Sequence, residues 1–339
     1  MPTKREFLGG AVATGLITAA VSPAKTQALP HIRWGHVLPP MAQVAGLFTK
    51  KPEILKNLNK TYTFEAVYLR GAPLLVTALA SKQIDIANLA FFSLYLAVSN
   101  AGLSDLRVIF DECEDNIDGH FSSEMRVLKD SGINRIEDMK GKIAGISVLG
   151  SASDLQFRNM MRKHDLEFNR DYTFLETPIA AAKAMLLERK IHAGFFAQPF
   201  ASDPEVIEKT KVLFTTADSM GNMMANFVVG RGDFLKANRA AMVDFMEDYF
   251  RLIRWYYDPA NRKEALEIVS QVSKIPAAVL DTYLFTIKDN YRPMDGIANL
   301  AAIQSNMKVQ KELGFAKSEI NVEDHADLSM IKEAAARFK

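Results

Sequence analysis

Predicted strands and helices alternate in two separate stretches of the chain, and this alternation limits the possible folds more than any other feature. Short runs rich in β-branched and aromatic residues are followed by segments with apolar residues at helical spacing. Strand, helix and strand with short joins imply parallel pairing through right-handed crossovers. We therefore expect two α/β units. Their predicted strands are residues 31–37, 61–69, 84–90, 142–149, 172–176 and 193–197.

Length and composition fit a globular protein with one large domain or two medium ones. The chain has 339 residues, of which 48% are hydrophobic and 24% charged, and both values are ordinary. Its 41 basic and 40 acidic residues are interspersed, with a formal net charge of +1. This balance argues against the basic surface that nucleic-acid binding requires. The single cysteine, Cys113, excludes an internal disulfide.

The first 28 residues have the form of an export signal: a basic start, a weakly apolar middle and small residues at the end. Cleavage after Ala24 or Ala28 is compatible with this form, and we favour Ala28. The start resembles a twin-arginine signal with Lys4 in place of the first arginine, so twin-arginine and general secretory export both stay open. A retained N-terminal helix is the alternative. We expect the mature protein to be exported, soluble and free of membrane spans, since no later apolar stretch approaches the roughly 20 residues required.

Three segments carry a recognisable order of motifs. Residues 71–93 read GAPLLVTALASKQIDIANLAFFS, and residues 136–161 read IEDMKGKIAGISVLGSASDLQFRNMM. Residues 183–200 read KAMLLERKIHAGFFAQPF. In order and spacing they resemble the periplasmic substrate-binding proteins of nitrate, sulfonate and taurine ABC transporters. Gln83 and His192 stand where that family commonly has a glycine and an aspartate. The resemblance covers nearly all of the chain from about residue 30.

The resemblance implies a bilobed type II periplasmic binding protein fold, with two α/β lobes joined by two hinge crossings. The first lobe would comprise residues 29–121 and 226–339, including a helical tail that packs back on it. The second would comprise residues 122–225. It also implies a monomer that captures a ligand in the cleft and delivers it to a membrane permease driven by a separate ATPase. No cofactor, metal or catalytic residue is expected.

Candidate ligand contacts in the first lobe follow from the geometry of parallel sheets, where ligands lie at the carboxyl ends of strands and helix amino-termini point the same way. The helix that begins near Pro73 offers free N–H groups that suit an anion. Alternatively, Phe91 and Phe92 belong to the core and Arg70 is a surface charge. The candidates are Arg70, Gly71, Asn88, Phe91, Phe92 and Ser93, with Met41 from the loop after the first strand.

The second lobe repeats this arrangement, with a strand end facing a helix start. Ser153, with Gln156 three residues later, has the spacing of a capping box, so Ser153 is expected either to cap the helix or to contact the ligand. Gly150 and Ser151 lie just before it and are expected to meet the ligand. Two further candidates are Gln198, at a strand end, and Asn226, near the returning hinge crossing.

Three functions compete on this sequence. Capture of a small organic anion, a sulfonate or an aromatic carboxylate, fits two helix starts and an arginine. A neutral pyrimidine or other planar heterocycle could instead stack on Phe91 or Phe92. An enzyme resembling the synthases of the thiamin pyrimidine is disfavoured, because Cys113 alone cannot supply the cysteine-rich motif of that branch. The scattered histidines also lack metal-ligand spacing. The tripeptide Arg231–Asp233 resembles an adhesion motif, but a tripeptide recurs by chance, and we discount an interaction module on this ground.

Overall fold

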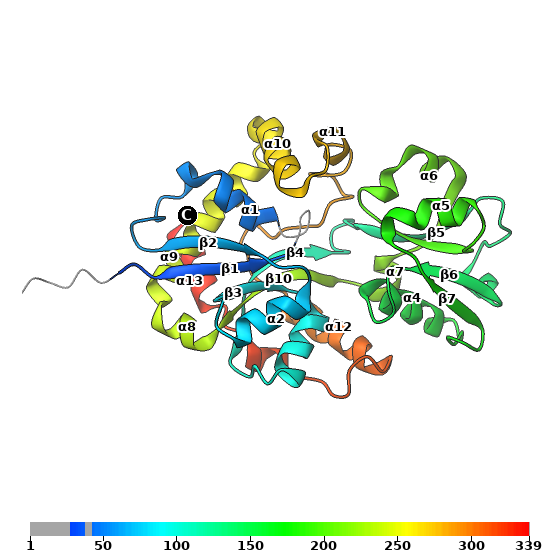
Figure 1. Cartoon of the computed structure of the whole chain (residues 1–339), viewed down its shortest axis with the longest axis horizontal. Coiled ribbons are helices and arrows are strands. Elements are labelled where there is room, and N and C mark those ends of the chain that lie inside the picture. Colours follow the sequence, from blue (N-terminus) through cyan, green and yellow to red (C-terminus); the bar gives the residue numbers. More distant parts are fainter. Residues whose placement is uncertain (1–27, 38–42, 339) are drawn as a thin grey trace, which may run out of the picture.

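The computed structural model describes residues 28–37 and 43–338, which form two lobes lying side by side (Figure 1). Each lobe contains one five-stranded sheet with helices around it. The predicted bilobed α/β architecture is confirmed. Residues 1–27 of the predicted export signal, and Met41, lie outside the described residues.

The sheet of the first lobe combines parallel and antiparallel strands. Its strands are β1 (His31–His36), β2 (Thr63–Tyr68), β3 (Ile86–Leu89), β4 (Leu106–Asp115) and β10 (Met223–Arg231). They lie in the order β2-β1-β3-β10-β4. As predicted, β1 pairs in parallel with β2 and β3. Strand β10 arrives from the second lobe and runs antiparallel to both β3 and β4.

The sheet of the second lobe repeats this plan. Its strands are β5 (Ser123–Leu128), β6 (Lys142–Ile146), β7 (Tyr172–Glu176), β8 (Ala193–Ala197) and β9 (Thr210–Thr215). They lie in the order β7-β6-β8-β5-β9, with β6 parallel to β7 and β8 and with β5 antiparallel to its neighbours. Pairs of βαβ units in both lobes give the parallel strands that the alternating sequence predicted.

The two crossings between the lobes lie at matching edges of the sheets. One leads from β4 to β5, and the other leads from β9 to β10 through a short helix. Strand β10 begins at Met223 in the first sheet, two residues before the predicted end of the second lobe at residue 225. Because β4 and β9 are edge strands, the opposite edges, β2 and β7, are the strands farthest from the hinge within their sheets.

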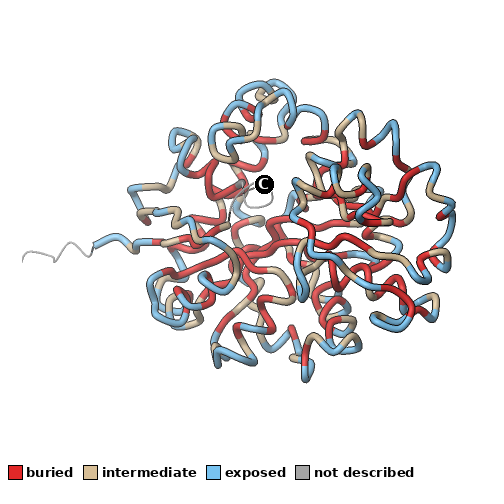
Figure 2. Tube along the Cα trace, turned by 45° about the vertical axis from the view of Figure 1, so that its right-hand side comes forward, coloured by how far each residue is buried: buried red, intermediate tan, exposed pale blue. Residues whose placement is uncertain are grey.

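Helices cover both faces of each sheet, and the central strands between them are largely buried, whereas the edge strands β2 and β7 are not (Figure 2). The tail packs on the first lobe, where its last helix, Ser329–Arg337, contacts the helix Arg239–Tyr257 and β4. The helices of the first lobe are α1 (Gln43–Lys50), α2 (Ala72–Ala80), α3 (Phe91–Tyr95), α8 (Gly232–Ala237), α9 (Arg239–Tyr257), α10 (Arg262–Ser273), α11 (Ala277–Leu280), α12 (Leu300–Glu312) and α13 (Ser329–Arg337). Those of the second are α4 (Ala152–Lys163), α5 (Ala182–Leu187), α6 (Pro204–Lys209) and α7 (Thr216–Met220).

Trp34 organises the core of the first lobe on the side of α1 and α9. Its fully buried ring lies edge-on to Phe48, Phe110 and Phe245, at centroid distances of 5.8, 5.8 and 5.7 Å. Edge-to-face pairs of this kind add to the stabilisation from burial alone. The carboxyl end of β1 is thereby held in a rigid layer. Within the described residues, no helix is both long and apolar enough to cross a membrane.

Candidate functional site

A cavity of about 300 Å³ lies where the two lobes and the returning hinge strand meet. We call it the interlobe cavity. The first lobe contributes the ends of β1 and β3 and the starts of α2 and α3. The second lobe contributes the start of α4. Its lining residues are Val37, Ala72, Leu75, Asn88, Leu89, Ala90, Phe91, Phe92, Ser93, Ala152, Met223, Ala225 and Asn226.

One helix start from each lobe reaches this cavity. Ala72 is the first residue of α2 and Ala152 the first residue of α4, and both line the wall. The first N–H groups of a helix have no partner within it, and the helix dipole is positive there. In α2, Gly71 precedes the helix with a φ of 89°, a conformation that favours glycine. The two starts together make the cavity suitable for a negative or strongly polar group.

Asn226 supplies the clearest polar group of the wall. Its side chain is only 5% exposed, and its Nδ2 amino group has no hydrogen-bond partner among the described residues. The register between β10 and β4 shifts on both sides of Asn226, which lies opposite Cys113. Such irregularities commonly re-aim a side chain. A buried donor without an acceptor is costly, and a ligand oxygen in the adjoining cavity would supply that acceptor.

Asn88 also lines the cavity, but its amide is already engaged on both sides. Its Oδ1 accepts a hydrogen bond from Trp34 Nε1 at 2.8 Å, and its Nδ2 donates to Glu112 Oε2 at 3.2 Å. Glu112 is fully buried and also accepts from the backbone N–H of Val44 at 3.2 Å. Burial raises the pKa of Glu112 to about 7, against the opposing charge of Arg292 and these hydrogen bonds. Asn88 is therefore a rigid part of the wall.

Phe91, Phe92 and Ser93 all line the cavity, although they form the first turn of α3 and not a strand end. Phe91 is 2% exposed, whereas Phe92 is half-buried, and their rings meet edge to face at 5.6 Å. The hydroxyl of Ser93 donates to the backbone oxygen of Ala90 and accepts from its N–H, both at 2.9 Å. Phe92 is accordingly the more accessible apolar surface, and Ser93 fixes the turn.

The loop before α4 differs from the prediction. Ser151, not Ser153, caps the helix: its side chain accepts from the N–H of Asp154. Ser153 lies inside the first turn, and its Oγ accepts from the N–H of Ser147 at 3.0 Å. The expected capping box fails because the helix begins two residues earlier than Ser153 predicts. The N–H of Gly150 is also engaged, since it donates to Asp154 Oδ2 at 2.8 Å.

The other predicted contacts lie outside the interlobe cavity. Arg70 is exposed and precedes α2, and it forms no ion pair with any described residue. Gly71, Gly150, Ser151 and Ser153 adjoin lining residues without lining the cavity themselves. The N–H of Gln198 donates to the backbone oxygen of Ser122 at 3.0 Å, away from the lining set. A ligand contact by any of these residues stays a prediction.

Sequence reasoning missed the small and aliphatic part of the wall. Ala72, Leu75 and Ala152 were hidden because apolar residues at helix starts look the same as core residues. Ala225 belongs to the returning strand, whose position opposite the helix starts depends on the tertiary fold. The proximity of Ala152 to two predicted serines was the only available signal for the second lobe.

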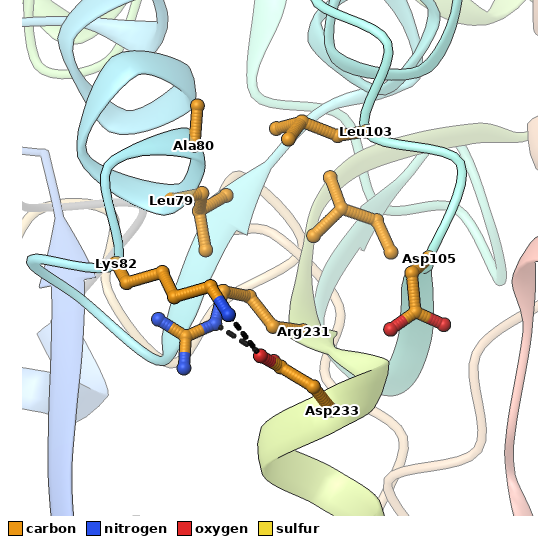
Figure 3. Close-up of a pocket in the computed structure, with 8 residues that line it drawn as sticks. Leu79, Ala80, Lys82, Leu103, Asp105, Arg231 and Asp233 are labelled. Carbon is orange, nitrogen blue, oxygen red and sulfur yellow. Dashed lines mark hydrogen bonds and ion pairs between the residues drawn. The ribbon is translucent and has the colours of Figure 1, made fainter.

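A second cavity, of about 210 Å³, lies at the C-terminal ends of α2 and β10, whereas the interlobe cavity lies near their N-terminal ends (Figure 3). There the carboxylate of Asp233 accepts from Lys82 Nζ at 2.6 Å and from Arg231 Nε at 3.1 Å. Arg231 also lies 3.3 Å from the buried Asp85. These charges are paired with one another, so the adhesion-like tripeptide at Arg231 is part of a partly exposed ion-pair network within the first lobe.

Comparison with known proteins agrees with this architecture. The model of the NMT1-like family matches residues 36–270. The aliphatic sulphonate binding protein SsuA of Escherichia coli superposes with a TM-score of 0.69 at 16% identity, over 88% of this chain and 92% of that one. A sulfonate-binding protein SsuA of Methylobacillus flagellatus gives 0.70 at 17% identity, over 91% and 94%.

A third solved structure, the nitrate-binding protein NrtA of Synechocystis, gives a TM-score of 0.66 at 11% identity, over 92% of this chain and 89% of that one. No curated protein sequence matches the chain significantly. At these identities the structural likeness shows a shared fold, and the predicted resemblance to nitrate and sulfonate binding proteins is confirmed at that level.

Proposed function

The chain belongs to the NMT1-like family, and on that premise we propose that it is the solute-binding component of an ABC importer. The fold supports this proposal, because solved proteins of the same architecture bind sulfonates or nitrate. So does the interlobe cavity, whose wall is shared between both lobes. The described lining residues include no histidine, cysteine or carboxylate that could act as an acid, a base or a nucleophile. Binding without chemistry is the simplest use of such a site.

The ligand we propose is a small organic anion with an apolar body, such as a sulfonate or an aromatic carboxylate. The observation that carries this proposal is that Asn226, whose buried Nδ2 has no partner among the described residues, lines a cavity that two helix starts reach. Those groups would hold the anionic head. Leu75, Leu89 and Phe92 would enclose the body. Bare nitrate has no apolar part to match these side chains.

A neutral planar heterocycle is the second candidate. One observation favours it: none of the described lining residues is a lysine or an arginine. An amide and helix N–H groups also serve neutral carbonyl oxygens, and Phe92 offers a ring face or edge for stacking.

Capture would take place in the periplasm after export, and delivery would need a membrane permease with its ATPase. The protein itself would act as a monomer.

Thermal unfolding of the mature protein, beginning at Leu29, tests the function and the ligand class together. The panel comprises nitrate, alkyl and aryl sulfonates, aromatic carboxylates and pyrimidines. A ligand at 100 times its dissociation constant stabilises the native state by about 2.7 kcal/mol. We expect the largest rise in midpoint with an aryl sulfonate or carboxylate. A rise with pyrimidines alone would replace the anion by the heterocycle, and no rise with any compound would count against a solute-binding role.

The test variant is Asn226→Ala, and its matched control is Asn290→Ala. Both are buried asparagines whose Nδ2 lacks a partner among the described residues, but only Asn226 lines the interlobe cavity. We expect Asn226→Ala to reduce the ligand-induced rise sharply and Asn290→Ala to preserve it. Equal losses would contradict the assignment of Asn226 to the ligand. Arg70→Ala belongs in the same series, because Arg70 was predicted from sequence as a counter-charge.

A further inference from the structure

We propose that the chain has a second binding site, beside the hinge, for a small neutral aromatic amide. The site is a cavity of about 270 Å³ that we call the hinge pocket. Its wall is formed by His120 in the crossing from β4 to β5, by Tyr257 at the end of α9, and by residues between 285 and 294. It shares no lining residue with the interlobe cavity. The inference goes beyond the proposed function, because solute capture between the lobes does not use this site.

The segment after α11 is fastened both to the hinge crossing and to the strand that leads into it. Tyr291 exchanges backbone hydrogen bonds with Glu114 of β4, at 2.8 and 2.9 Å. The N–H of Phe121 donates to the backbone oxygen of Ile287 at 3.0 Å. His120 meets Tyr291 edge to face, with ring centroids 5.6 Å apart. These contacts hold the wall of the hinge pocket in place from the side of the crossing.

The hinge pocket contains two hydrogen-bond donors that the folded protein leaves unused. Asn290 is 6% exposed and lines the pocket, and its Nδ2 group has no partner among the described residues. The hydroxyl oxygen of Tyr257 accepts from Arg292 Nη1 at 3.3 Å, which leaves the hydroxyl proton for another acceptor. Burial raises the pKa of Tyr257 to about 12, so the hydroxyl keeps this proton. A buried donor without an acceptor is costly, and a ligand carbonyl oxygen supplies that acceptor.

His120 adds an acceptor to the same wall. Its Nδ1 lies 3.0 Å from the backbone oxygen of Asp289. Because a carbonyl oxygen only accepts, Nδ1 carries the proton, and in the neutral ring Nε2 is left as an acceptor. A primary amide has both a carbonyl oxygen and N–H donors, so it matches the donors and the acceptor of this wall together. A carboxylate has acceptor oxygens only and leaves Nε2 without a donor.

The charges and rings of the wall favour a neutral aromatic ligand. Arg292 and Asp289, 3% and 5% exposed, bring one buried positive and one buried negative group to the pocket. The carboxylate of Asp289 accepts from the N–H groups of Asn290 and Phe285, at 2.8 and 3.2 Å. An anion would face this carboxylate, whereas an uncharged amide would not be repelled by it. The rings of Tyr257 and Phe285 lie 5.8 Å apart at 90° and offer flat surfaces to an aromatic ring.

Protection of a thiol tests this site in the mature protein. Met294→Cys places a reporter in the wall, because Met294 lines the pocket and is 49% exposed. Ile287→Cys is the matched control, since Ile287 lies in the same segment, is 59% exposed and does not line the pocket. The native Cys113 is fully buried, so the introduced thiol is the reactive one. Modification by N-ethylmaleimide is followed by mass spectrometry. Benzamide is the probe, and benzoate is its anionic counterpart of similar shape.

We expect benzamide, at about ten times the dissociation constant from its own concentration series, to slow modification of the Met294→Cys protein on the order of tenfold. Modification of the Ile287→Cys protein should be unchanged. In the Met294→Cys background, Asn290→Ala should remove the protection and Asn226→Ala should preserve it. Circular dichroism checks that each variant is folded. If Asn290→Ala does not fold, the comparison of the two reporters still decides.

Equal rates with and without benzamide, or equal protection of both reporters, would overturn the proposal. Protection that persists in a folded Asn290→Ala variant would do the same. Benzoate that protects as well as benzamide would reject a neutral amide as the ligand. Protection that is lost in Asn226→Ala would assign benzamide to the interlobe cavity instead of the hinge pocket. Because the test requires no ligand of the interlobe cavity, its outcome is independent of the proposed function.

Discussion

Trp34 and Asn88 are joined by a 2.8 Å hydrogen bond from the indole nitrogen to the side-chain oxygen, and this contact orients the wall of the interlobe cavity. An indole N–H can only donate, so the oxygen of the Asn88 amide must face Trp34. The amino group then faces Glu112 on β4. One asparagine thus connects the aromatic core around Trp34, the buried carboxyl group of Glu112 and the ligand cavity.

Replacing Asn88 should destabilise the fold more than a typical polar substitution. In Asn88→Ala, the indole N–H of Trp34 and the carboxyl of Glu112 each lose a partner in the buried interior. An unsatisfied buried group costs about 1–3 kcal/mol, so the loss for the two groups should be on the order of 2–6 kcal/mol. Urea unfolding measures it. Asn134→Ala is the control, since Asn134 lies in an exposed turn, and a similar loss in both variants would refute the role of this network.

Asn226→Ala should act in the opposite way, with a large effect on binding and a small one on folding. The Nδ2 group has no partner among the described residues, so its removal breaks no hydrogen bond of the folded protein. A hydrogen bond to a charged ligand contributes about 1.5–3 kcal/mol, which predicts a loss in affinity on the order of 10- to 100-fold. Isothermal titration with the tightest compound of the panel gives the affinity. The idea fails if affinity is unchanged while the unfolding midpoint falls.

The pH dependence of stability should report on Glu112. Burial raises its native-state pKa from 4.5 to about 7. Between these values the native protein holds a proton that the unfolded chain has released. The free energy of unfolding therefore falls as the pH rises from about 4.5 to about 7, and this group alone accounts for on the order of 3 kcal/mol.

Glu112→Gln separates this contribution from others of the same sign. Burial also raises the pKa of Asp115 to about 6, so the wild type loses stability with rising pH for more than one reason. The variant removes only the cost of ionising residue 112. Urea unfolding at about pH 5 and about pH 8 should show a smaller fall in the variant than in the wild type. Identical falls would mean that Glu112 does not titrate in this range.

The cap of α4 gives a local test of the corrected assignment. Ser151→Ala removes the side-chain oxygen that accepts from the N–H of Asp154, and losing an N-cap costs about 0.5–2 kcal/mol. Ser151→Gly should cost only roughly 0.3 kcal/mol, because glycine is tolerated at an N-cap. Chemical denaturation of both variants distinguishes a cap from a ligand contact. Equal losses for alanine and glycine would argue against the cap.

The sequence by itself determined the class of fold, the parallel strands and one wall of the site. The alternation of strand and helix patterns depends on local periodicity, which each segment carries in its own residues. Asn88 near the end of β3 and Phe92 in the first turn of α3 lie where the same patterns predict, and Asn226 was named because a strand was predicted to begin there, although it lies inside β10. For this reason they could be named as candidates before their surroundings were known.

Only the tertiary structure decided which of these candidates meet. It placed Asn226 beside the starts of α2 and α4, and it engaged the amide of Asn88 with Trp34 and Glu112. It also assigned the cap of α4 to Ser151, because two serines near a helix start compete for that place and the loop geometry selects one. These outcomes depend on contacts between residues far apart in the chain. Local sequence patterns fix the elements, whereas hydrogen-bond partners and cavities arise only when the elements pack together.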